Sequence, residues 1–133
     1  MIGAGGIRIV LLVDVIRAVG PGRRKERQMH TQVITFELNG ITEEQWHGAA
    51  GAEAPTFAAL PDLLAKTWLR DPETNTYGGI YLWADQEAYE RYIEGPIFNA
   101  LKNDQHLQNF ESRVFGVFED LTSITTPNLH VDA

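Results

Sequence analysis

Apolar and aromatic residues gather in four short segments of the chain, and these segments predict four β-strands. In residues 31–38, Ile34, Phe36 and Leu38 share one face, and Val33 and Thr35 lie on the other. Only a short polar turn separates the second and third segments, so these two should form an antiparallel hairpin. We expect the remaining strands at residues 63–69, 77–83 and 110–118.

The first predicted helix follows the first strand. Thr42 and Gln45 have the spacing of a capping box, and Ile41 before them can act as a hydrophobic staple. Pro55 has no amide proton to donate, so we expect a kink or a break in this helix near that residue. The apolar residues expected to face inward are Trp46, Ala49, Ala50 and Phe57.

The second predicted helix follows the hairpin. Asp85 should cap it, and Glu87 in its first turn suits the helix dipole. Gly95 and Pro96 end it, and a short helical stretch over residues 96–101 comes next. Its inward stripe comprises Ala88, Tyr89, Tyr92 and Ile93.

The resulting order is strand, helix, hairpin, helix, strand, which is the β-α-β-β-α-β order of the ferredoxin-like α+β fold with a four-stranded antiparallel sheet. The helices would cover one face of the sheet. Because the hairpin strands are apolar or aromatic on both faces, the other face should also be buried. In a chain this short, the simplest cover is a second copy, so we expect a homodimer that forms a dimeric α/β barrel.

Charge separates the first 28 residues from the rest. They carry six Lys or Arg and two Asp or Glu, whereas the remaining chain carries five and sixteen, within a net charge of −7. We interpret 1–28 as an extension upstream of the natural start, before Met29; a loosely packed tail and a targeting segment are the alternatives. We expect residues 29–126 to form the domain and 127–133 a polar tail, with the chain loose from Ser123 onward.

Composition excludes several classes of function. An acidic domain repels a phosphate backbone, so no nucleic-acid partner is expected. The apolar run near the start is shorter than the about 20 residues of a membrane span, so no membrane association is expected either. The chain has no cysteine, which excludes disulfides and thiolate chemistry and leaves the cytoplasm as the default compartment.

Between Pro61 and Leu121 the chain contains a recognisable set of features, namely Pro61, the pattern Leu64-x-Lys66-x-Trp68, the segment Tyr77-Gly78-Gly79-Ile80-Tyr81-Leu82, Ala88 and Tyr92, and Arg113-Val114-Phe115-x-Val117. By these features, residues 61–121 resemble the YdhR-like family of monooxygenases within the dimeric α/β-barrel superfamily. The family usually has Gly where Asp62 stands and Trp where Ala65 stands. If that Trp lines a pocket in relatives, this chain should have a larger or differently shaped cavity.

The resemblance implies a monooxygenase of the small quinone-forming type. The sequence has no dinucleotide motif, and its four histidines lack ligand spacing with carboxylates, so no cofactor and no metal are expected. The substrate must then supply the electrons. A phenol or hydroquinone can do so, because its anion is electron-rich enough to react with O₂ directly.

Lys66 and Trp68 share one face of their strand, as do Tyr81 and Trp83 of the next. A lysine about 4 Å from a phenolate, at an effective dielectric near 20, attracts it by up to about 4 kcal/mol before desolvation. This attraction lowers the phenol pKa by up to about three units. We therefore expect Lys66, Trp68 and His106, a candidate base, as catalytic residues. The expected substrate-binding residues are Phe36, Tyr81, Trp83, Tyr89 and Arg113.

Each of these residues also has a structural interpretation. Trp68 and Trp83 fit a core or a dimer interface, and Lys66 can extend to the sheet edge. Arg113 can pair with Glu111 or Glu119, and Tyr89 fits a helix core stripe. Gly78-Gly79 indicates a bulge or a close backbone approach rather than a phosphate loop.

Three functions remain open at this stage. The first is a cofactor-independent monooxygenase that acts on a small aromatic substrate. The second is a non-catalytic protein, such as a stress-associated one, that binds a small hydrophobic ligand in the same cavity. The third is a structural subunit whose barrel serves only assembly. The fold alone does not separate them.

Overall fold

The computed structural model describes residues 27–127, and these form the expected ferredoxin-like α+β fold. Its elements follow the predicted order, with one further helix at the end. They are β2 (His30–Leu38), α2 (Glu43–Ala58), β3 (Leu63–Asp71), β4 (Thr76–Trp83), α3 (Gln86–Ile93), α4 (Pro96–Lys102), β5 (Leu107–Gly116) and α5 (Glu119–Thr125).

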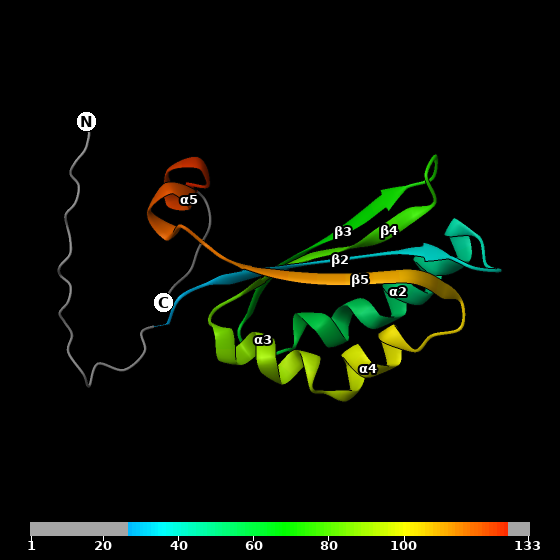
Figure 1. Cartoon of the computed structure of the whole chain (residues 1–133), viewed down its shortest axis with the longest axis horizontal. Coiled ribbons are helices and arrows are strands. Elements are labelled where there is room, and N and C mark those ends of the chain that lie inside the picture. The colour runs from blue at the N-terminus through cyan, green and yellow to red at the C-terminus, as the bar shows by residue number, and fades with distance from the viewer. Residues whose placement is uncertain (1–26, 128–133) are drawn as a thin grey trace.

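The four strands form one antiparallel sheet in the order β3-β4-β2-β5. Figure 1 shows the sheet edge-on, with α2, α3 and α4 together on one face. The helix α5 stands beyond one end of the sheet, on the side away from these three helices (Figure 1). The sheet therefore has a covered face and an open face.

The core lies between the covered face and the three helices. Along β2 every second residue, from Gln32 to Leu38, is buried, as the alternation predicts. Gln32 is the buried polar residue among them, and it accepts a hydrogen bond from the indole of Trp83 and donates one to Ser112. Both polar ends of its amide are thus satisfied, so its burial carries no unpaired group.

A β-bulge sets which residues of β3 face the core. Leu63 lies opposite Trp83, and Ala65 lies opposite Leu82, so Leu64 is an extra residue in the strand. Residues directly opposite each other share a face, and Lys66 therefore lies on the covered face opposite Tyr81. Without the bulge, Leu63 and Lys66 would lie on different faces.

Both helix caps have the predicted form. The Thr42 side chain accepts from the Gln45 amide while the Gln45 side chain accepts from the Thr42 amide, which completes the capping box. The Asp85 carboxylate accepts from the Ala88 amide. A kink or a break was predicted near Pro55; the helix has no break there, because α2 continues through Pro55 to Ala58.

The end of the chain differs from the prediction in two ways. The fourth strand begins at Leu107 rather than at residue 110, because Leu107 pairs with Leu38 beyond an irregularity near Asn109, whose φ is +53°. Residues from 119 onward, expected to be loose after Ser123, form α5. The i, i+3 spacing of Leu121 and Ile124 is helical, and both side chains are exposed.

Gly78 is a point of close backbone approach, as predicted. Its φ is +153°, and a Cβ there would lie 1.9 Å from the Ile34 carbonyl oxygen. No side chain fits in that space, so only glycine allows β4 to approach β2 this closely.

The open face carries exposed apolar side chains from several strands. Ile80 of β4 and Phe115 of β5 are 39% and 41% exposed. Both lie opposite residues of β2 on this face, namely Val33 and Thr31. In a single chain these side chains have no cover from the three helices (Figure 1).

Candidate active site

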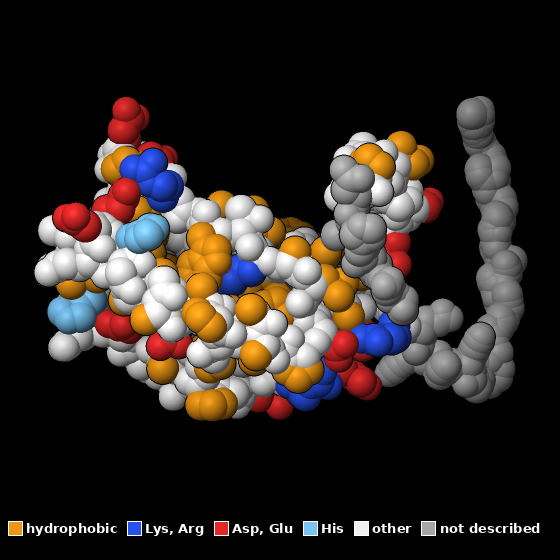
Figure 2. Space-filling model, turned by 180° about the vertical axis from the view of Figure 1, so that it is seen from behind, with side chains coloured by type: hydrophobic (Ala, Val, Ile, Leu, Met, Phe, Trp, Pro, Cys, Tyr) orange, Lys and Arg blue, Asp and Glu red, His pale blue; other side chains and the backbone are white. Residues whose placement is uncertain are grey.

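A cavity of about 570 Å³ opens between the covered face and the helices α2 and α4. Its walls are mostly apolar or aromatic, and two acidic residues, Glu53 and Asp104, also line it. Figure 2 shows hydrophobic side chains around a basic one near the middle of the face that it views, with the acidic side chains towards its ends. The lining residues that bear on the chemistry are Phe57, Lys66, Trp68, Tyr81, Ile97 and Leu101.

Lys66 is the basic residue of this cavity. Its Nζ lies 3.3 Å from the ring centroid of Phe57, 3.4 Å from that of Trp68 and 4.6 Å from that of Tyr81. Within residues 27–127, no hydrogen bond or ion pair joins this amine to a carboxylate. Burial without a counter-charge lowers the pKa of Lys66 to about 7. The three ring faces attract the ammonium form and oppose this shift.

Gly79 makes room for the lysine. A Cβ at this position would lie 3.1 Å from Cε of Lys66 and 3.3 Å from the Tyr81 ring. The absence of a side chain lets the stem of Lys66 lie across the backbone of β4, with its amine among the rings. The two glycines therefore have different roles: Gly78 allows β4 to approach β2 closely, and Gly79 makes space for Lys66 beside the cavity.

The phenol groups behind the cavity are buried. The hydroxyls of Tyr81 and Tyr92 lie 3.3 Å apart and form a hydrogen bond. Burial raises the pKa of Tyr81 strongly and that of Tyr92 in the same direction. Both hydroxyls therefore stay neutral at physiological pH.

The structure brings four of the eight sequence-predicted site residues to this cavity. Lys66 and Trp68 of β3, Tyr81 of β4 and Phe36 of β2 all line it. Trp68 is 38% exposed and contacts Phe57 edge-on, with ring centroids 5.5 Å apart. The sequence predicted that Lys66 shares a face with Trp68 and that Tyr81 shares one with Trp83. The register of the sheet shows that both pairs lie on the same face, because Lys66 is opposite Tyr81.

The other four predicted residues lie elsewhere. Trp83 is 1% exposed and bonded to Gln32, and Tyr89 packs against the core cluster from α3. Arg113 is exposed on β5, where its guanidinium carbon lies 4.9 Å from the Phe115 ring centroid and no ion pair joins it to Glu111 or Glu119. His106 is exposed near a sheet end, with a ring nitrogen 3.4 Å from the Asn39 carbonyl. Their proposed roles stay predictions.

Sequence reasoning missed Phe57 as a site residue, although it placed this side chain inward. Phe57 is buried in α2 and touches the rings of Trp68, Tyr81 and Tyr92 as well as the Lys66 amine. Its inward position follows from helical spacing. Its contact with Lys66 depends on how α2 crosses the sheet, which no local pattern specifies.

The residues that differ from the family pattern have structural explanations. Asp62 has a φ of +66°, a left-handed conformation that glycine adopts without strain. Ala65 lies opposite Leu82 on the open face, away from the cavity. Ala65 does not line the cavity in this chain, because it alternates with Lys66 along β3 and therefore faces the other way.

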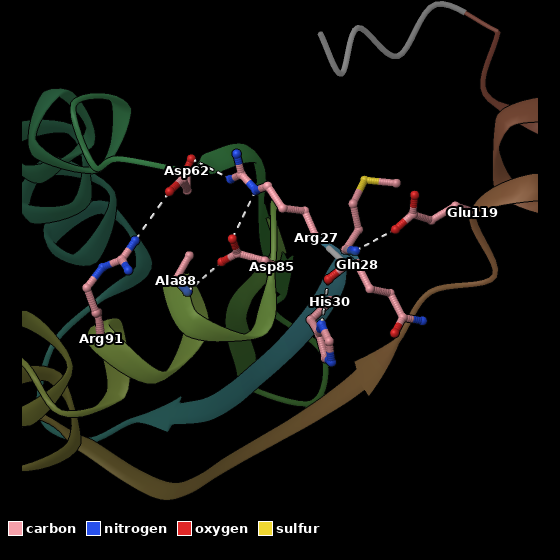
Figure 3. A network of polar contacts seen from close by, with 9 residues as sticks. Arg27, Gln28, His30, Asp62, Asp85, Ala88, Arg91 and Glu119 are labelled. Atoms are coloured by element: carbon pink, nitrogen blue, oxygen red, sulfur yellow. Dashed lines mark hydrogen bonds and ion pairs between the residues drawn. The ribbon is translucent and has the colours of Figure 1, made fainter. Parts of the chain in front are cut away.

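A cluster of charged residues fixes the strained Asp62 (Figure 3). Its carboxylate accepts from Arg27 at 2.9 Å and from Arg91 at 3.3 Å, and Arg27 also donates to Asp85 at 3.0 Å. Arg27 comes from the segment interpreted as an extension, of which residues 1–26 lie outside the described residues. The cluster joins the start of the domain to the first turn of α3.

A larger hollow of about 1190 Å³ lies beside this cluster, between α3 and the start of α5. It is open and lined largely by charged side chains, among them Asp85, Glu90 and Asp120. Its residues are exposed or bonded to one another, and no described aromatic cage or buried amine faces it. The smaller aromatic cavity is the better candidate site.

Within the described part of the chain, no three histidine, aspartate or glutamate side chains form a group that could hold a metal ion. No helix among residues 27–127 is long and apolar enough to cross a membrane.

The fold and the cavity define a small ferredoxin-like α+β protein with a ligand-sized aromatic chamber. The family model described as "Putative mono-oxygenase ydhR" matches residues 32–128. The chain therefore belongs to the ydhR family. No curated protein matches the sequence.

Solved structures agree with this placement. SnoaB from Streptomyces nogalater, a cofactor-independent oxygenase, is 25% identical, with a TM-score of 0.56 over 68% of this chain and 93% of SnoaB. The heme-degrader MhuD from Mycobacterium tuberculosis is 16% identical, with a TM-score of 0.55 over 67% of this chain and 95% of MhuD. A Nitrosomonas europaea protein of unknown function is 16% identical, with a TM-score of 0.58 over 69% of this chain and 91% of that one. The likeness to the last two shows the fold alone.

Proposed function

We propose that this protein is a cofactor-independent monooxygenase that oxidises a small phenol or hydroquinone with O₂ in the aromatic cavity. The observation that carries the proposal is the amine of Lys66, which lies among three aromatic rings without a carboxylate partner in the described residues. Family membership and the likeness to SnoaB, itself a cofactor-independent oxygenase, support the reaction class.

Lys66 would act first as a base. A neutral amine accepts the phenol proton, and the ammonium that results pairs with the phenolate where water is scarce. This pairing also restores the pKa of Lys66 towards its ordinary range, because the phenolate supplies the missing counter-charge. The base and the electrostatic partner are thus one group.

The anion then supplies electrons to O₂. A carbon–oxygen bond forms at a ring carbon that bears hydrogen, para to the phenolate in a phenol and ortho to it in a hydroquinone, and the ammonium of Lys66 gives its proton to the peroxide. Loss of the ring C–H proton and of water leaves a quinone. One oxygen atom of O₂ enters the product and the other becomes water, so the phenol supplies all the electrons. Trp68 and Phe57 would hold the ring, and the apolar walls exclude water.

Oxygen consumption tests this proposal. The full chain is mixed with a panel of hydroquinones and anthrone-like compounds, while O₂ uptake and quinone absorbance are followed. We expect Lys66→Met to lower turnover about 100-fold or more, because a general base typically contributes that much. Lys102→Met, the same change at an exposed position of α4, is the matched control and should leave turnover unchanged. Equal turnover by wild type and Lys66→Met would disprove the role of Lys66.

Lys66→Arg separates the two roles of the amine. Arginine keeps the charge but does not give up its proton at these pH values. This variant should still bind phenolates at high pH yet turn over slowly at neutral pH. Tight phenol binding without any O₂ uptake by the wild type would favour the second candidate function, a ligand-binding protein that uses the same cavity.

We also propose that two copies pair through the open face of the sheet and form a dimeric barrel. The exposed side chains of Ile80, Phe115 and Leu121 support this, because isolated chains rarely leave so much apolar surface in contact with water. A second copy would bury this face and close the sheet layer.

A further inference from the structure

The amine of Lys66 has the surroundings of a nucleophile. Lysines that attack carbonyl carbons are buried among apolar groups and lack a carboxylate partner, because a carboxylate would hold them in the ammonium form. Lys66 meets both conditions within the described residues. Its Nζ faces Phe57, Trp68 and Tyr81, and the cavity beyond has room for a small ring.

We propose that Lys66 forms an imine with small, uncharged aromatic aldehydes and ketones, so that the cavity is also a covalent site for carbonyl compounds. A carbonyl carbon within bonding distance of Nζ places its ring against the faces of Phe57 and Trp68. The aliphatic wall formed by Ile97 and Leu101 favours an uncharged substituent. This inference goes beyond the oxygenase function and does not depend on it.

The chemistry balances without an oxidant. The nitrogen lone pair forms a C–N bond, and the carbonyl π electrons move to oxygen, which takes a proton. The nitrogen loses its protons, the hydroxyl leaves with one of them as water, and a C=N bond remains. The overall change is amine plus carbonyl giving imine plus water.

Several titratable groups face or flank this amine. Tyr81 on β4 contacts it, and Glu53 of α2 and Asp104 after α4 line the same cavity. Tyr92 of α3 bonds to Tyr81 from behind. Burial raises the pKa of Tyr81, so this hydroxyl stays protonated, while the lowered pKa of Lys66 leaves a neutral amine available near pH 7.

Reductive trapping tests the inference. The full chain is incubated under nitrogen with benzaldehyde and cyanoborohydride at pH 7, and the modified peptides are identified by mass spectrometry. The chain has three lysines, so Lys102 on the surface of α4 provides an internal reference. We expect Lys66 to be labelled faster than Lys102 by on the order of tenfold or more, because an ordinary lysine is almost fully protonated at this pH.

Three controls make the result decisive. Lys66→Arg should remove this adduct while circular dichroism shows an intact fold, and Lys102→Arg should leave it. An added phenol should protect Lys66, because it occupies the same cavity. The preference for Lys66 should shrink as the pH approaches 10, where Lys102 also becomes neutral.

Labelling of Lys66 no faster than that of Lys102 would overturn the inference, whereas undiminished labelling in the presence of excess phenol would contradict only the binding of phenols in this cavity. Because trapping is done without O₂, its failure is distinct from failure of the oxygenase proposal. A protein that forms the imine yet consumes no O₂ with any phenol would retain the carbonyl site and lose the oxygenase function.

Discussion

Lys66 couples the cavity to the stability of the domain through its proton. Below pH 7 the amine is protonated in both the folded and the unfolded chain, so the folded state carries the full cost of a buried charge. Between about 7 and the ordinary value of 10.5 the unfolded chain holds a proton that the folded chain has released. The free energy of unfolding should therefore rise with pH across this window.

The comparison of wild type with Lys66→Met isolates this contribution. We expect the variant to be the more stable protein at pH 6, by about 1 to 3 kcal/mol, since each pKa unit is worth about 1.4 kcal/mol and the aromatic rings offset part of the shift. The difference should narrow towards pH 9. Urea denaturation at fixed protein concentration measures it, and parallel pH profiles would contradict the assignment.

Asp62 provides a second prediction at the scale of one residue. Asp62→Ala and Asp62→Gly both lose the contacts with Arg27 and Arg91, but only glycine accepts a φ of +66° freely. We expect Asp62→Gly to be the more stable of the two by about 1 kcal/mol. Urea midpoints measure this difference. Equal midpoints would mean that the backbone is not strained at this position.

At the scale of elements, replacing a glycine by alanine should have opposite effects on stability in β4 and in α2. Gly78→Ala would place a Cβ 1.9 Å from the Ile34 carbonyl oxygen, so the two strands must separate. We expect a loss of several kcal/mol, or failure to fold. Gly48→Ala in α2 meets nothing within 4 Å and should stabilise the domain by about 0.5 to 1 kcal/mol.

Thermal melting of these two variants measures both effects. Gly48→Ala is the matched control, because it makes the same chemical change at an open helical site. If Gly78→Ala and the wild type had the same melting temperature, the inference that β4 and β2 approach too closely for a side chain would be wrong.

The elements were largely predictable from the sequence, because local signals specify them. The alternation in β2 and the caps at Thr42 and Asp85 depend only on neighbours in the chain. The prediction failed where the pattern was interrupted. The start of β5 was missed because the pairing is irregular near Asn109, whose φ is positive. The helix α5 was missed because it is short and most of its residues are polar.

The candidate site was predictable only in part, because it depends on the whole molecule. Lys66 with Trp68, and Tyr81 with Trp83, could be paired within their own strands. That Lys66 lies opposite Tyr81 requires the register of the hairpin, and that Phe57 covers both requires the packing of α2. The sequence therefore identifies the types of residue in the site but not the distances between those on different elements.

At the scale of the whole molecule, the prediction concerns the association of two copies through the open face of the sheet. If two copies pair through it, Ile80→Asp and Phe115→Asp should each shift the protein towards monomer, because each would bury an unpaired charge in the interface. Thr56→Asp on the exposed side of α2 adds the same charge away from this face and should leave the assembly unchanged. Sedimentation velocity measures the outcome. A wild type that sediments as a monomer at micromolar concentrations would contradict the dimer.

The extra residue at Leu64 separates two parts of β3 that differ in their tolerance of change. The hairpin with β4 fixes the orientation of every side chain after it, including the amine in the cavity. A change of loop length near Pro61 can be absorbed at this irregularity, whereas an insertion between Ala65 and Trp68 would exchange the inside and outside of the strand. Natural variation in length should therefore gather before Leu64, and a protein engineer who wishes to lengthen this connection should do so on that side.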